Sequence, residues 1–181
     1  MSKRHTVIRS LHDLGMSAWF GGSLMGAVGL NGATGQANDP TERLRLSSLG
    51  WKKWAPVSAV AIGAHAIGGA GLIGTDSGRI AQDAGSKANT STKLVLTIAA
   101  AGLTAYAGVL GAKVEKESDQ GGVGATEPKP GASDGLKAAQ KQLKAVQWAI
   151  PALTGVLTVM GAQQGEQQRP SQQLVGRFTG K

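Results

Sequence analysis

The chain has 181 residues, a formal net charge of +8 and no cysteine. The length indicates one domain, and the lack of cysteine excludes disulfides, thiol catalysis and thiolate-bound iron–sulfur clusters. The positive charge raises the question of nucleic acid, but Lys and Arg are spread over every connector without a basic stripe of interleaved aromatics. We therefore expect no nucleic-acid partner, and contacts with anionic lipid headgroups instead.

Four stretches of the sequence contain no Asp, Glu, Lys or Arg. They are residues 14–38, 54–75, 94–112 and 145–165, with lengths of 19 to 25 residues. A helix rises about 1.5 Å per residue, so roughly 20 uncharged residues cross a bilayer core. Soluble bundle helices normally carry a charged face, which these stretches lack. We predict an all-α, integral membrane four-helix bundle with spans at about 10–33, 54–75, 93–112 and 145–164.

The first predicted span follows a basic start that includes Lys3, Arg4 and Arg9. A cleaved signal peptide ending near residues 33–37 is the alternative. The uncharged stretch is long and rich in glycine, so we favour a retained span in the cell inner (plasma) membrane. The early cations favour a cytoplasmic N-terminus, but Lys and Arg are balanced over the connectors as a whole, which leaves the orientation open.

The second predicted span opens with residues typical of a membrane interface. Trp51, Lys52, Lys53 and Trp54 precede or begin the uncharged stretch, and Trp148 has the corresponding place in the fourth span. Aromatic and cationic side chains of this kind anchor helices at headgroup level. The connector before this span predicts a short surface helix within residues 38–46, and residues 75–92, rich in Gly, Ser and Asn, predict a solvated loop.

The third connector divides into two parts. Residues 113–135 combine mixed charge with Gly and Pro and predict a flexible, disordered loop. A helix is expected to start at Ser133 or Asp134, and its amphipathic stretch at 135–146 is predicted to lie at the interface before the fourth span. Residues 1–165 thus form the spanning domain, and residues 166–181 predict a polar, flexible tail.

His65 lies at the centre of the second uncharged stretch. An ionisable group near the bilayer midplane is a candidate functional residue, while a neutral histidine that binds another helix by a hydrogen bond is the structural alternative. Its neighbours at helical spacing are mostly small, so we expect His65 to face another helix.

Small residues recur at helical spacing and predict close helix packing. A glycine-rich phosphate loop is the competing interpretation of residues 21–29, but no strand precedes them and no Lys follows. The candidate packing residues are Gly22, Gly26, Gly29, Gly68, Gly69, Ala100, Thr104 and Gly108.

His12 is the second histidine that merits attention, because two histidines could ligate a haem or a metal. It lies near the start of the first span, about 18 Å from the middle by helical rise, so its depth is not expected to match that of His65. A solvated pair of His12 and Asp13 at headgroup level is expected instead. We predict no catalytic residue, no metal site and no cofactor, because the sequence contains no hydrolase, zinc or paired-carboxylate motif.

The run Leu11-His12-Asp13-Leu14, followed by Ala18-Trp19-Phe20-Gly21-Gly22, resembles the first helix of copper-resistance D-type and related small polytopic membrane proteins. The resemblance covers only this helix and implies matching positions for His12, Trp19, Gly21 and Gly22. The later spans depart from it, because they offer no Met/His cluster for copper.

The whole chain is also similar to uncharacterised small multi-helix membrane proteins of high-GC actinobacteria. The similarity lies in its Gly/Ala-rich spans and in the segments DPTERLRLSSLGWKKWAP and QWAIPALTGVLTVMGAQQGEQQRP. It implies a membrane location and a bacterial class, but no activity.

The functional expectation is a non-enzymatic membrane protein that acts through helix contacts. It would be an accessory or scaffold subunit of a membrane complex, or a homo-oligomer, with lipid and other membrane subunits as partners. A small transporter or permeation pathway that uses His65 is the alternative, and haem or copper handling is a further one.

Overall fold

The computed structural model describes residues 5–82 and 84–167, and their regular structure is helical apart from one isolated bridge between Gly122 and Pro128. The predicted all-α class is confirmed. The first helical segment consists of α1 (Thr6–Met25), a π turn η1 (Gly26–Leu30) and the short α2 (Asn31–Thr34). Three long helices follow: α3 (Pro40–Gln82), α4 (Ala84–Lys116) and α5 (Asp134–Gln167), with a 3₁₀ turn η2 (Ser118–Gln120) after α4.

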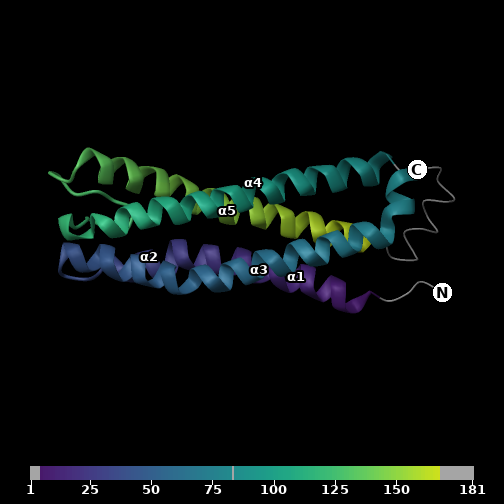
Figure 1. Cartoon of the computed structure of the whole chain (residues 1–181), viewed down its shortest axis with the longest axis horizontal. Helices are drawn as coiled ribbons and strands as arrows, with labels where there is room; N and C mark the ends of the chain where they lie inside the picture. The colour runs from purple at the N-terminus through teal and green to yellow at the C-terminus, as the bar shows by residue number, and fades with distance from the viewer. Residues whose placement is uncertain (1–4, 83, 168–181) are drawn as a thin grey trace.

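The helices form an elongated bundle of two layers (Figure 1). Helices α1, α2 and α3 make one layer, and α4 and α5 make the other. Helix α1 begins and α5 ends at the same end of the bundle, where α3 is also succeeded by α4. The connectors after α2 and after α4 meet at the opposite end, so each layer is a helical hairpin of sequence neighbours.

Three helices in the described part of the chain are long and apolar enough to cross a membrane. They are Pro40–Thr75, Lys87–Lys116 and Asp134–Gln163. Helix α1 is not among them, so the first of the four predicted spans lacks this support. The reason lies in its first half, where Arg9, His12 and Asp13 interrupt the apolar sequence.

Apolar side chains cover the outside of these helices. Val60, Ile67, Val95 and Val109 are each between 65% and 72% exposed. The interior has an apolar core, but it also contains polar side chains, and Ser58, His65, Gln147 and Thr154 are all buried. An apolar exterior with polar groups inside is favourable where lipid, not water, surrounds the helices.

Helices α1 and α3 approach closely enough for their backbones to touch. A Cβ atom at Gly15 would lie 2.5 Å from the carbonyl oxygen of Ala61, and one at Gly68 would lie 2.5 Å from the amide nitrogen of His12. Farther along, the rings of Trp54 and Trp51 cover Gly22 and Gly26. Glycine is therefore required where this antiparallel pair is in contact, because any side chain would separate the helices.

The contacts also show that the uncharged stretches of α1 and α3 are staggered. Residues 12–26, in α1 and at the start of η1, lie beside residues 51–68 of α3. As a result, the charged start of α1 lies next to the second half of the uncharged stretch of α3. The depth of a residue in its own helix therefore does not give its depth in the bundle.

The predicted disordered loop is ordered. Residues 113–116 complete α4, and the segment after it packs against α3 and α5, with Ala125 and Thr126 buried. Gln140, which is fully buried in α5, donates from Nε2 to the carbonyl oxygens of residues 124 and 125 at 3.3 and 3.2 Å. Arg43 of α3 donates from Nη1 to the carbonyl oxygen of Val123 at 2.8 Å. Pairing with the helices thus compensates for the polar composition of this segment.

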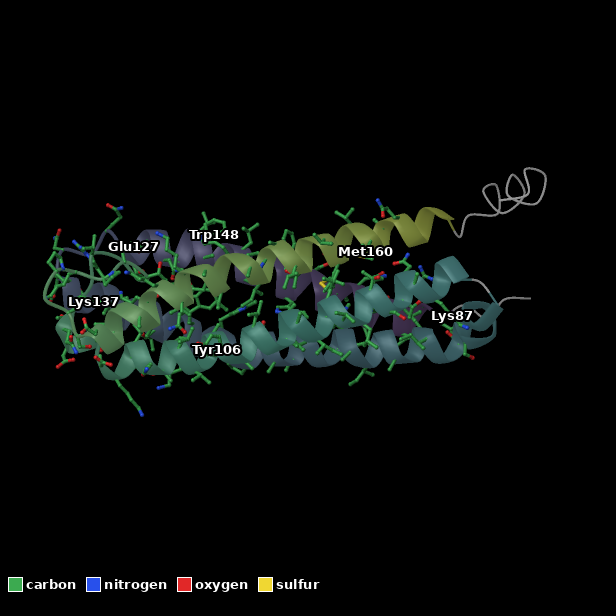
Figure 2. All side chains as sticks on the ribbon, turned by 90° about the horizontal axis from the view of Figure 1, so that it is seen from above. Lys87, Tyr106, Glu127, Lys137, Trp148 and Met160 are labelled. Atoms are coloured by element: carbon green, nitrogen blue, oxygen red, sulfur yellow. The ribbon has the colours of Figure 1, made fainter. Side chains whose placement is uncertain are left out.

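An ion pair closes the same loop onto α5. The Lys144 Nζ lies 2.9 Å from Oε1 of Glu127. Partial burial raises the pKa of Glu127, but hydrogen bonds from Lys144 and Thr126 and the charge of Lys144 lower it by more, so the pKa lies below its usual range. Figure 2 shows Glu127 and Lys137 at this end of the bundle and Lys87 at the other end.

The remaining connectors also differ from expectation. No separate interfacial helix exists at 135–146, because α5 is continuous and Leu136, Ala139, Leu143 and Val146 belong to the core. Its start at Asp134 agrees with the prediction, and the Ser133 hydroxyl accepts from the amide of Leu136 at 3.0 Å. Residues 40–46 are the first turns of α3, and residues 75–82 and 84–92 are helical. The predicted tail lies outside the described residues from position 168 onward.

The close contact of α1 and α3 predicts that Gly15→Ala destabilises the protein by about 1–3 kcal/mol, because the new methyl group meets backbone that cannot move alone. The measurement is the free energy of unfolding in detergent micelles, from a denaturant titration. Gly21→Ala is the matched control on the same helix, since nothing lies within 4 Å of its added Cβ. Equal stability of the two variants would contradict the close contact.

Candidate functional site

The most distinctive arrangement inside the bundle is a pair of stacked histidines. The rings of His12 on α1 and His65 on α3 have centroids 4.0 Å apart and planes inclined by 23°. Each ring binds the backbone of the opposite helix: Nδ1 of His12 lies 3.0 Å from the carbonyl oxygen of His65, and Nδ1 of His65 lies 3.0 Å from that of His12. We call this reciprocal pair the histidine clasp.

The hydrogen bonds of the clasp determine the tautomer of both rings. A carbonyl oxygen can only accept, so each Nδ1 carries the proton and donates it. In a neutral ring the lone pair is then on Nε2. The clasp therefore holds α1 against α3 and leaves each Nε2 as an acceptor.

Trp19 connects the histidine clasp to the second layer. Its ring, which is 1% exposed, meets the His65 ring edge-on at a centroid distance of 6.4 Å. Its Nε1 donates to the Thr104 hydroxyl on α4 at 3.1 Å, and that hydroxyl donates to the carbonyl oxygen of Ala100 at 2.8 Å. A ring contact and a hydrogen bond thus connect α3 through Trp19 of α1 to α4.

Charged residues lie near the clasp. Asp13 and Lys93 interact electrostatically with both histidines, and Arg9 does so with His12. His65 is therefore not an isolated ionisable group among apolar neighbours. The stagger of α1 against α3 brings it to the level of charged residues from two other helices.

The expectation that His12 and His65 differ in depth is wrong. It assumed that the uncharged stretches of α1 and α3 lie level, whereas their stagger brings the two rings into contact. The geometry nevertheless opposes a haem held between the two rings, because a porphyrin cannot fit between stacked rings with centroids 4.0 Å apart. Among the described residues, no group of three or more His, Cys, Asp or Glu side chains could hold a metal ion.

A second polar cluster lies toward the other end of α1, directly after the π turn. The Asn31 Nδ2 donates to Oε1 of Gln147 on α5 at 2.7 Å. Its Oδ1 accepts from the Ser47 hydroxyl at 3.1 Å and from Nε1 of Trp51 at 3.0 Å, both on α3. This asparagine junction satisfies the polar groups of three elements at once. A π turn adds a residue to one helical turn and is common at functional sites.

The predicted packing residues fall into two groups. Those on α1 and α3 mostly lie at helix contacts, since Gly22 and Gly26 meet tryptophan rings, Gly68 meets the α1 backbone and Gly69 lies against the His12 ring. On α4, Ala100 is fully buried and Thr104 binds Trp19, whereas an added Cβ at Gly108 would meet nothing within 4 Å. An added Cβ at Gly29 would contact only Met25 of its own helix.

The predicted interface anchors also have different surroundings. Trp51 and Trp54 are half-buried against α1, while Trp148 is 51% exposed on α5 (Figure 2). Lys52 pairs with Glu115 of α4 at 3.0 Å. Lys53 lines an outward-opening groove between α1 and α3.

Sequence reasoning did not identify Asn31, Gln147 or the role of His12. One signal was present: the spacing His-x-x-Gly occurs twice, as His12 to Gly15 and as His65 to Gly68, and the structure pairs the two copies. Asn31 and Gln147 also stand out as amide side chains within uncharged stretches, where such groups need partners.

No protein-family model, curated protein or solved structure matches the chain. The resemblances noted in the first helix and in the whole sequence therefore stay predictions. Conclusions on function depend on the geometry alone.

The histidine clasp predicts that the two histidines are energetically coupled. In a double-mutant cycle of His12→Ala and His65→Ala, the double variant should lose about 1 kcal/mol less than the sum of the single variants, because either change breaks the stacking and one of the two hydrogen bonds. The free energy of unfolding in mixed micelles is the quantity to compare. His5→Ala, at an exposed position, should add independently to either. Strict additivity of His12→Ala and His65→Ala would argue against a clasp.

Proposed function

We propose that the chain is a non-enzymatic, four-span protein of the plasma membrane that acts through lateral helix contacts, as a homo-oligomer or as an accessory subunit. The three apolar helices and their outward-facing valines and isoleucines support membrane residence. Helix α1 is proposed to span the membrane in addition to these three helices, held against α3 by the histidine clasp. Because of the stagger, its charged residues at 9 and 13 would then lie beside the second half of the uncharged stretch of α3, with Asp13 close to the level of His65.

The observation that carries the proposal is the poor coverage of α4. Of the apolar stretch of α4, 11% is buried within the bundle, compared with 33% for α5. Val95, Ile98, Gly102 and Val109 share one outward face of α4, and the three large side chains are 63% to 65% exposed. An added Cβ at Gly102 would meet nothing within 4 Å. A glycine in such a face lets a second helix approach closely in lipid, which offers no hydrophobic drive for helix association.

This proposal predicts crosslinking through α4. The chain has no cysteine, so Ile98→Cys introduces a single thiol. In native membranes, oxidation with copper phenanthroline should join it by a disulfide to the same thiol of a second copy, or a maleimide–benzophenone label on it should photocrosslink to another subunit. Adding Gly102→Leu should reduce the product at least about tenfold, because loss of close packing costs more than about 1.4 kcal/mol. Band masses on denaturing gels and mass spectrometry identify the partner.

Two controls make the crosslinking result specific. Val60→Cys places a thiol on α3, where the side chain is 72% exposed, and should give little product. Gly74→Leu on α3 adds the same side chain at another open glycine and should leave the Ile98→Cys product unchanged. A strictly monomeric protein without partners in native membranes would eliminate the proposal.

Transport is the second candidate function, favoured by the charged residues around the histidine clasp. Asp13 and Lys93 interact electrostatically with both histidines, and each histidine Nε2 is left as an acceptor. A proton pathway requires ionisable groups and proton acceptors of this kind. If the protein conducts protons, His65→Ala should reduce proton flux into liposomes at least about tenfold, since it removes a relay group. Gly21→Ala liposomes are the control for reconstitution. An unchanged flux in His65→Ala would remove this candidate.

A further inference from the structure

A groove on the outer side of the α1/α3 layer has the features of a lipid site. Its volume is about 430 Å³, within the range of small-molecule sites. Gly22, Gly26 and Gly50 contribute no side chains to it, the rings of Trp51 and Trp54 border it, and Lys53 is its charged residue. No residue of α4 or α5 lines it, so it opens toward the surroundings of the bundle.

Contacts among its lining residues, and one hydrogen bond to a residue outside it, hold the shape of the groove in place. The Trp51 ring lies over Gly26 and its Nε1 donates to Asn31, so the asparagine junction fixes its orientation. The Trp54 ring lies over Gly22. On the opposite wall, the π turn η1 supplies Gly26, Gly29 and Leu30. The groove is therefore preformed, which limits the entropy lost on binding.

The charge of the groove and its depth along the bundle indicate which ligand it would bind. Lys53 makes no ion pair within the described residues, whereas the adjacent Lys52 is neutralised by Glu115. Lys53 also marks the limit of the uncharged stretch of α3, and Lys113 marks the limit of that of α4 at the same end of the bundle. Tryptophans and lysines at the end of a span lie at the depth of lipid headgroups. An unpaired cation next to an apolar groove at this depth is complementary to a phosphate joined to an acyl chain.

We propose that this groove binds one anionic glycerophospholipid, with the phosphate at Lys53 and the start of one acyl chain along the glycines and between Trp51 and Trp54. The inference depends on membrane residence but not on the contact face of α4. The two proposals therefore fail separately, since one is read by bound lipid and the other by crosslinking.

The test counts lipid bound to the purified full-length protein in neutral detergent, by native mass spectrometry. Dioleoyl phosphatidylglycerol should bind at one site more tightly than dioleoyl phosphatidylcholine. Lys53→Gln should weaken phosphatidylglycerol binding about fivefold, the effect of one well-placed cation, and should weaken phosphatidylcholine binding by less, because its choline group neutralises the phosphate. Gly29→Leu should abolish the site for both lipids, because its side chain enters the groove and an added Cβ there meets only Met25.

Two matched controls separate the groove from general attraction to a basic protein. Lys52→Gln removes the same charge one residue away, and Gly32→Leu adds the same side chain where nothing lies within 4 Å of the added Cβ. Both should retain wild-type binding. Circular dichroism and size-exclusion elution establish that each variant is folded.

Three results would overturn the proposal: equal binding of the two lipids by the wild-type protein, equal loss in Lys53→Gln and Lys52→Gln, or retained binding in folded Gly29→Leu. A shift from dimer to monomer in Gly29→Leu with unchanged lipid binding would show that a second copy, not a lipid, occupies the groove. That outcome would also overturn it.

Discussion

The backbone contact between α1 and α3 is the constraint on which the other features depend. With Gly15 against α3 and Gly68 against α1, the antiparallel register of the two helices is fixed. That register places His12 opposite His65, puts Gly22 and Gly26 under two tryptophan rings, and delivers Asn31 to the side chains of α3 and α5. In lipid the backbone contact and the interhelical hydrogen bonds replace the hydrophobic drive that would hold a soluble bundle together.

The interior polar groups are used as connections between helices. The histidine clasp joins α1 to α3, the bond from Trp19 to Thr104 joins α1 to α4, and the asparagine junction joins α2 and α3 to α5. Helix α4 has the smallest buried share of the three apolar helices, 11% of its apolar stretch. Its exposed face is apolar, whereas the groove between α1 and α3 has one cation, Lys53.

Much of the architecture follows from the charge pattern, because a run without charges long enough to cross a bilayer predicts a helix regardless of partners. The start of α5 at Asp134 was also predictable from local sequence, because Ser133 can cap the first turn of the helix. What the sequence could not give was register. The depth of His12 depends on how far α1 slides along α3, and the order of residues 117–133 depends on Arg43, Gln140 and Lys144, which are distant in sequence. Local composition contains neither kind of information.

The division into two hairpins has a consequence for biogenesis. Because α1 and α3 precede α4 in the chain, both histidines of the clasp are synthesised before α4. The contacts of the clasp between α1 and α3 therefore do not require the later helices. The bonds from Trp19 and Asn31 to the second hairpin, in contrast, can form only after α4 and α5 have been synthesised.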